Sequence, residues 1–285
     1  MCPSESSSKP ARTTATTKAV RASGSRLPSA KQLTEALVAR QFVPFYQPLW
    51  DVQHQRWEGV ETLIRWQHPV QGLLLPDAFI PVAEQSGLIL ELGAWILHTA
   101  FQQMADWHHQ GLSNGIVAVN VSALQMHQPD FVEQVLTTLQ LTGLAPSSLE
   151  LELTEPLTLQ DTPSLIENMH RFNEMGIRLS IDDFGTGNSS LARLQCCPVT
   201  RLKIDKSFVA HMEADSKSLN IMASIITLGH SLNLSVVAEG VETGKQQRLL
   251  AQMECNVLQG FHIGIPSTSQ QTEVIWHKHN MLNKE

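Results

Sequence analysis

The sequence is poor in cysteine, has no excess of basic residues and contains no long apolar run. Its four cysteines are Cys2, Cys196, Cys197 and Cys255, and they form no CxxC pair and no zinc-ligand spacing with histidine. We therefore expect reduced thiols and a cytoplasmic protein. The formal net charge of -7 argues against a nucleic-acid polymer as a partner, because such proteins present a basic face. No apolar run reaches the roughly 20 residues of a membrane span, so we expect no membrane span in this chain.

The N-terminal segment differs in composition from the rest of the chain. Residues 1–30 are rich in Ser, Thr, Ala and Pro, and their basic residues face a single acid, Glu5. Such a segment cannot bury enough apolar surface to fold alone. We expect a disordered tail or linker over residues 1–30, with a basic targeting arm as the alternative, and one folded domain over residues 31–285.

From residue 31 onward, short β-like runs alternate with amphipathic helical stretches. The runs lie at 42–47, 60–65, 116–121, 149–155, 178–182, 201–204, 235–239 and 257–261. Helical stretches such as 89–111 and 218–233 separate most of them. Eight strands with helical crossovers predict a parallel sheet in an α/β fold, a (β/α)8 TIM-type barrel. The first two runs have no helix between them, so we expect a hairpin there and an irregular barrel at its first strands.

Polar residues recur at the ends of these strands, where parallel barrels place their active sites. They are Arg65, Asn120, Glu152, Glu155, Asp182, Asp183, Lys203, Asp205, Glu239 and Gln259, with Glu61 on the same strand face as Arg65. In the run LELELTE (149–155), alternating leucines belong under the helices. Glu150 and Glu152 on the opposite face should then point into the barrel.

Carboxylates inside a barrel need compensating charge, because burying them unpaired is costly. Lys203 and Arg65 are too few to neutralise the cluster, and oxygen-rich clusters of this kind suit Mg2+ or Mn2+. Adjacent Asp182 and Asp183 could share two cations about 4 Å apart, which is the arrangement of two-metal phosphoryl transfer. The alternative is that strand-end carboxylates only cap helices or face solvent. The predicted metal ligands are Glu61, Asn120, Glu152, Asp182, Asp183 and Glu239.

Eight short motifs resemble the family of EAL-domain cyclic-di-GMP phosphodiesterases. They are YQP (46–48), ETLIRW (61–66), VNVS (119–122), ELTE (152–155), DDFGTG (182–187), KID (203–205), AEGVE (238–242) and QGF (259–261). They occur in the family's order over about residues 31 to 270, with Thr62 in place of the alanine that gives the family its name. The departures are Asn188, where an aromatic residue is usual, and Ile265, where many members carry Arg or Lys.

The resemblance implies a role for each matching residue. Glu61, Asn120, Glu152 and Asp182 would bind a first cation, and Asp182, Asp183 and Glu239 a second. Lys203 would position or deprotonate the attacking water, so that Lys203, Glu61 and Glu239 form the catalytic set. Gln47, Arg65, Gln259 and Asp205 would lie on the substrate side, with Asp205 also helping to hold the lysine. Glu155 and Glu242 would anchor the loop after the aspartate pair and hold the ligands in place.

The reaction that the resemblance implies is hydrolysis of cyclic-di-GMP to linear pGpG with two divalent cations, Mg2+ or Mn2+. A second hypothesis is a catalytically silent receptor that binds cyclic-di-GMP, although the complete ligand set favours the enzyme. A third, an unrelated barrel enzyme acting on a sugar phosphate, would require the motif order to be coincidental. We also expect a homodimer and regulatory domains outside this chain.

Overall fold

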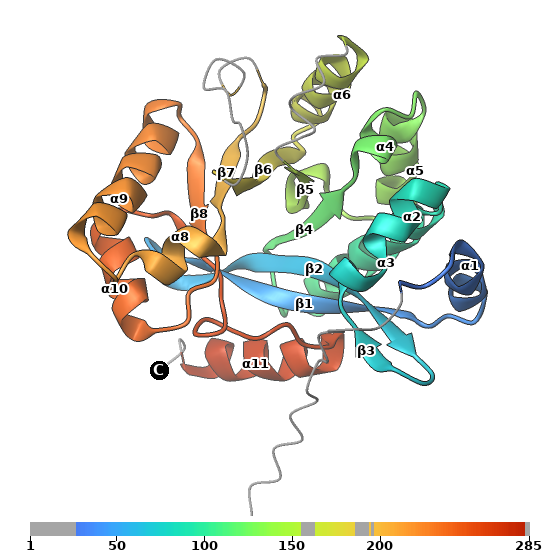
Figure 1. The fold of residues 1–285 in the computed structure, drawn as a ribbon, viewed down its shortest axis with the longest axis horizontal. Coiled ribbons are helices and arrows are strands. Elements are labelled where there is room, and N and C mark those ends of the chain that lie inside the picture. Colours follow the sequence, from blue (N-terminus) through green and yellow to red (C-terminus); the bar gives the residue numbers. More distant parts are fainter. Residues whose placement is uncertain (1–26, 155–162, 186–193, 195–196, 283–285) are drawn as a thin grey trace, which may run out of the picture.

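The computed structural model describes residues 27–154, 163–185, 194 and 197–282 (Figure 1). Most of the segment expected to be a tail, Glu155 and Asn188 lie outside these residues. Within the described part of the chain, no helix has the length and apolar character needed to span a bilayer.

The strands form one sheet that closes into a barrel. The sheet order is β1-β9-β8-β7-β6-β5-β4-β2-β3, and an additional pairing of β1 with β2 closes eight strands, which leaves β3 as an extension of β2. The fold is therefore the expected α/β barrel. The strands are β1 (Phe42–Asp51), β2 (Arg56–His68), β3 (Gly72–Leu74), β4 (Ile116–Val121), β5 (Leu149–Thr154), β6 (Arg178–Phe184), β7 (Arg201–Ile204), β8 (Ser235–Ala238) and β9 (Val257–Leu258).

The first strand makes the barrel irregular. β1 runs antiparallel to both of its neighbours, β2 and β9, whereas the pairs from β2 through β4 to β9 around the rest of the barrel are parallel. The expected hairpin between the first two runs is confirmed, and the expectation of a parallel sheet is wrong for β1. The short turn between Asp51 and Arg56 explains the reversal, because a parallel connection needs a crossover of a dozen or more residues.

Helices cover the outside of the barrel (Figure 1). They are α1 (Ala30–Val38), α2 (Ile80–Ser86), α3 (Ile89–His109), α4 (Ala123–Met126), α5 (Phe131–Thr142), α6 (Pro163–Glu174), α8 (Lys206–His211), α9 (Ser216–Ser231), α10 (Gly244–Gln252) and α11 (Ser269–Leu282). Two 3-10 turns cover Pro76–Ala78 and Pro146–Ser148. The helical stretches expected at 89–111 and 218–233 correspond to α3 and α9.

Alternation along the strands separates two environments. Leu149, Leu151 and Leu153 of β5 are buried in the large hydrophobic cluster that includes residues of α3, α5 and α6. The opposite face of β5 carries Glu150 and Glu152, which are also buried. The predicted inward direction of the two glutamates is thus confirmed, because each contacts a cation on β7.

Candidate active site

Lys203 lies at the centre of a cluster of carboxylates near the carboxyl ends of the strands. Its Nζ atom is 2.6 Å from Glu239 Oε1, 2.9 Å from Glu152 Oε1, 3.2 Å from Asp182 Oδ1 and 3.5 Å from Glu61 Oε2. The lysine side chain is only 1% exposed. Three carboxylates from β2, β5 and β6, and a fourth from Glu239 directly after β8, therefore share one buried ammonium group.

Two side-chain amides hold Glu61 from either side. Asn120 Nδ2 donates to Glu61 Oε1 at 2.7 Å, and Gln259 Nε2 donates to Glu61 Oε2 at 2.5 Å. Gln259 Nε2 also lies 3.2 Å from Gln47 Oε1, and Gln47 in turn donates to the carbonyl of Gly264 at 3.1 Å. The carboxylate of Glu61 is thus held by Asn120 of β4 and by Gln259, which directly follows β9 and also contacts Gln47 of β1.

The adjacent aspartates lie where β6 departs from regular strand geometry. The register of β6 with β7 shifts between Ile181 and Phe184, and Asp183 has a positive φ of 55°. The Asp183 amide donates to Asp182 Oδ1 at 3.0 Å. Oxygen atoms of Asp182, Asp183 and Glu239 all lie within 4.8 Å of one another. Side chains that a regular strand would send to opposite faces therefore meet at one site.

Burial and mutual repulsion raise the pKa of several carboxyl groups. Burial, reinforced by the charges of Glu61 and Asp182, raises the pKa of Glu152 well above its ordinary value. The pKa of Glu239 is raised in the same direction, again mainly by burial. Burial and the neighbouring Asp182 raise the pKa of Asp183 to about 6. The protein groups alone thus leave the cluster short of positive charge.

The same negative charges also raise the pKa of Lys203, and there they favour the charged form. Burial disfavours its charged form, but the surrounding carboxylates outweigh burial and hold the pKa of Lys203 well above its ordinary value. The amine of Lys203 is therefore a charged hydrogen-bond donor.

The donor set fits divalent cations. Among the described residues, the buried Oε2 atom of Glu152 has no hydrogen-bond or ion-pair partner, and the Oε1 atoms of Glu152 and Glu239 share the one ammonium group of Lys203. Carboxylate oxygens are the preferred ligands of Mg2+ and Mn2+. Cations bound among these residues would supply the charge that a single lysine does not.

A cavity of about 430 Å³ opens beside this cluster. Glu61, Asn120, Asp182 and Asp183 form its polar wall. The remaining wall is mostly apolar and comes from β2, α2, α3 and the turn before α2, through Ile64, Pro76, Ile80, Ile89, Leu92 and Ile96. A cavity with carboxylate and amide groups on one side and apolar side chains on the other suits a ligand that carries both polar and apolar groups.

Comparisons with known proteins identify the fold and the family together. The profile described as EAL domain matches residues 30–266. This chain belongs to the EAL-domain family. The bifunctional diguanylate cyclase/cyclic di-GMP phosphodiesterase MucR of Pseudomonas aeruginosa is 43% identical to it over 239 residues, 84% of this chain and 35% of MucR. The signaling protein YkoW of Bacillus subtilis is 42% identical over 241 residues, 85% of this chain and 30% of YkoW.

A solved structure resembles this EAL domain over most of its length. The PaMucR phosphodiesterase in complex with c-di-GMP superposes with a TM-score of 0.81 at 42% identity, covering 85% of this chain and 98% of that chain. The chain spans about a third of the length of the curated relatives named above.

Other residues predicted for the site lie around the cluster rather than in it. Arg65 is only 8% exposed. Its Cζ atom lies 5.7 Å from the centroid of the Phe45 ring, and its Nη1 atom donates to the carbonyl of Ile64. Burial lowers the pKa of Arg65, against the opposing charges of Glu61 and Asp77. Arg65 is thus held near the rim by its own strand, on the side of Glu61.

Two residues expected to hold the ligands contact other parts of the EAL domain. Asp205 caps α8, and its Oδ1 atom accepts from the amide of Ser207 at 3.0 Å. Glu242 is exposed, and its described hydrogen bond is made by its backbone amide to Gln246. Their proposed roles, and that of Glu155 outside the described residues, stay predictions.

A second set of charges inside the barrel includes Arg201, which was not predicted from the sequence, and Glu150, whose inward direction was. Arg201 begins β7 and is buried, as is Glu150. Arg201 lies at the start of its strand, whereas the predicted site residues lie at or near strand ends. The period of two that relates Arg201 to Lys203 would have revealed that both side chains point inward.

Proposed function

We propose that this EAL domain hydrolyses one phosphodiester bond of cyclic-di-GMP and releases linear pGpG. The observation that carries the proposal is the set of four carboxylates around Lys203 beside the cavity. Support comes from MucR, whose name includes cyclic di-GMP phosphodiesterase activity and whose solved phosphodiesterase contains c-di-GMP.

Two divalent cations, Mg2+ or Mn2+, would be held by the carboxylates and by Asn120. Glu61, Asn120, Glu152 and Asp182 would hold one cation, and Asp182, Asp183 and Glu239 the other. Cations bound there would neutralise the phosphate and lower the pKa of a bound water.

The residues of the chain then divide the remaining work. Lys203, as a charged donor, would hold the attacking water or a phosphate oxygen in line with the scissile bond. The amides of Asn120 and Gln259 would keep Glu61 in its orientation, and Gln47 would extend the same network. Arg65 would meet the substrate phosphate at the rim, and the apolar wall would receive a guanine ring.

The alternative is a catalytically silent receptor for the same nucleotide. A binding cavity alone would be enough for a receptor. A receptor would not, however, explain why the complete set of carboxylates is kept, since burying them costs stability.

We further propose that regulatory domains lie outside this chain, which spans about a third of the length of its curated relatives. We also propose that the domain forms a homodimer and that it works in the cytoplasm.

The decisive experiment measures turnover and binding on the same protein. Purified protein is incubated with cyclic-di-GMP and Mg2+ or Mn2+, and pGpG is followed by chromatography. Glu61→Ala and a chelated sample run beside it, with the exposed-residue variant Val70→Ala as the matched control. We expect pGpG from the native and Val70→Ala proteins only. Saturable binding without pGpG from the native protein would instead support the receptor.

A further inference from the structure

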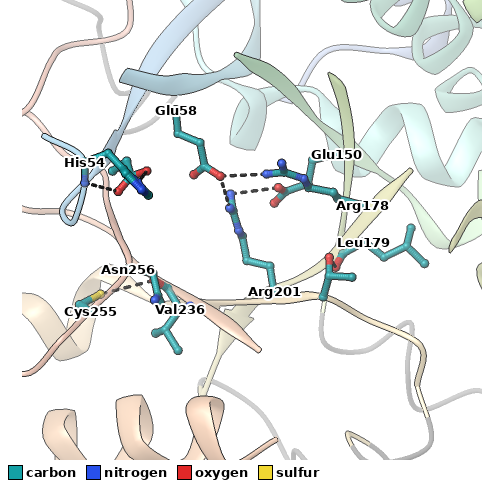
Figure 2. A network of polar contacts seen from close by, with 11 residues as sticks. His54, Glu58, Glu150, Arg178, Leu179, Arg201, Val236, Cys255 and Asn256 are labelled. Atoms are coloured by element: carbon teal, nitrogen blue, oxygen red, sulfur yellow. Dashed lines mark hydrogen bonds and ion pairs between the residues drawn. The ribbon is translucent and has the colours of Figure 1, made fainter. Parts of the chain in front are cut away.

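A second layer of charged side chains lies inside the barrel beneath the candidate active site. Glu58, Glu150, Arg178 and Arg201 converge there, and Figure 2 shows them joined in one network. The side chains of Glu150 and Arg201 are 1% and 4% exposed, so this pair is as buried as Lys203 above it.

Arg201 connects two of the acids directly. Its Nη1 atom lies 3.0 Å from Glu150 Oε2, and its Nη2 atom donates to Glu58 Oε1 at 2.5 Å. Arg178, which is 39% exposed, donates to the same Glu58 oxygen at 2.9 Å. Among the described residues, the guanidinium group of Arg201 is the basic group that forms an ion pair with Glu150.

A β-bulge brings Glu58 into this network. Along the hairpin, Leu49 pairs with Gly59 but the next residue, Trp50, pairs with Trp57, so Glu58 is left without a cross-strand partner. A bulge of this kind redirects the extra side chain. Glu58 and Glu61 can therefore contact interior cations although three positions separate them.

The two charged layers come from the same three strands. β2 supplies Glu58 below and Glu61 above, β5 supplies Glu150 and Glu152, and β7 supplies Arg201 and Lys203. On β5 and β7 the layers are two residues apart, roughly 7 Å along the strand. One guanidinium group thus joins the three strands that present Glu61, Glu152 and Lys203.

We propose that Arg201 is a positioning residue for the active site: by bridging Glu58 and Glu150, it fixes β2, β5 and β7 relative to one another and partly offsets the charge of Glu150 at Glu152 and Lys203. The inference rests on the proposed function, in which the upper layer, formed by Glu61, Glu152 and Lys203 with their neighbouring carboxylates, binds cations. The planar guanidinium is suited to this role because its fork meets two carboxylates in a fixed geometry.

Removing Arg201 would leave a buried carboxylate without its cation. Lys203, two positions along the same strand, is the interior cation that Glu150 would then attract, and Glu152 is the carboxylate that it would repel. Both changes disturb the upper layer. Replacing Glu150 by glutamine removes the unpaired charge that causes both changes. Glu150→Gln should therefore restore the arrangement of Glu152 and Lys203 that the loss of Arg201 disturbs.

The test measures Mn2+ binding to the full chain by calorimetry, together with pGpG formation. The proteins are the native chain, Arg201→Met, Glu150→Gln, the double variant Glu150→Gln/Arg201→Met, and Arg178→Met as the control that loses only a half-exposed partner of Glu58. We expect Arg201→Met to weaken Mn2+ binding about 10- to 100-fold, as loss of a group supporting metal ligands typically does. The double variant should recover most of that loss, and Arg178→Met should stay within about twofold of the native chain.

Rescue separates positioning from simple structural damage, because a packing defect at Arg201 would persist in the double variant. Native-like Mn2+ binding by Arg201→Met, or a double variant no better than the single one, would overturn the inference. If Arg201→Met does not fold, Arg201→Lys keeps the charge without the fork and should show a smaller loss that Glu150→Gln again reverses. If Arg201→Lys shows no loss of Mn2+ binding, or if Glu150→Gln does not reverse that loss, the inference is likewise overturned.

The two proposals fail in different ways. Mn2+ binding without pGpG from the native chain would overturn hydrolysis, and the Mn2+ series would still decide the role of Arg201. Normal hydrolysis together with Mn2+ affinities that do not change across the series would overturn the role of Arg201 alone.

Discussion

At the scale of single residues, Lys203 compensates more buried negative charge than any one lysine normally meets. It contacts four carboxylates, three on strands and one directly after β8, while its side chain is 1% exposed. In the absence of divalent cations the folded state therefore depends on this one ammonium group. The same crowding is what would favour cation binding, because added positive charge relieves repulsion among the carboxylates.

Replacing Lys203 by methionine should destabilise the metal-free protein. Removing one partner of a buried ion pair leaves uncompensated charge and costs about 3 kcal/mol or more. We expect the free energy of unfolding in urea with chelator to fall by about this amount for Lys203→Met, and Mn2+ to restore part of it. Lys31→Met is the control, because Lys31 is 85% exposed in its pair with Glu35 and should change stability by under about 1 kcal/mol. An equally small change for Lys203→Met would contradict this expectation.

At the scale of elements, the contact between β2 and β4 is unusually close. A Cβ atom on Gly59 would collide with the backbone carbonyl oxygen of Ile116. Gly59 also pairs with Leu49 next to the bulge that redirects Glu58. The absence of a side chain at Gly59 thus permits the close contact between β2 and β4, beside the bulge that contains Glu58.

Substituting Gly59 by alanine should push β2 away from β4. We expect Gly59→Ala to lower the free energy of unfolding by about 1–3 kcal/mol, the usual cost of adding a methyl group where there is no space. Urea denaturation followed by circular dichroism measures it, and Val70→Ala, at a side chain 87% exposed, is the control. Unchanged stability would mean that the two strands separate without loss.

The sequence predicts these elements unevenly, for physical reasons. β-like runs of four to seven residues located all eight barrel strands, because each strand must bury at least one face. β3 was missed, since Gly72–Leu74 is too short to show a period. The bulge at Glu58 was missed because a register shift depends on the partner strand. The carboxylate cluster was predicted from strand ends, whereas Arg201 at the start of a strand was not.

At the scale of the whole molecule, the folded domain and the N-terminal segment should be independent. The first described helix, α1, begins with a complete capping box between Ser29 and Gln32. Residues 1–26 have a composition that cannot form a core. We therefore expect deletion of residues 1–26 to change the free energy of unfolding and the Mn2+ affinity little, by about 0.5 kcal/mol or less. A larger loss in urea denaturation or calorimetry would show that the segment contributes to the domain.

The reversed first strand has a consequence for how the barrel can be connected to other protein. In a barrel of parallel strands only, the chain would enter at the end opposite the active site. Here Phe42 pairs with Trp66, beyond the Gln47 and Glu61 pair, so the chain enters on the catalytic side. α1 immediately precedes that entry point. A domain fused ahead of α1 would therefore join the barrel on the same side as the candidate active site rather than at the opposite end.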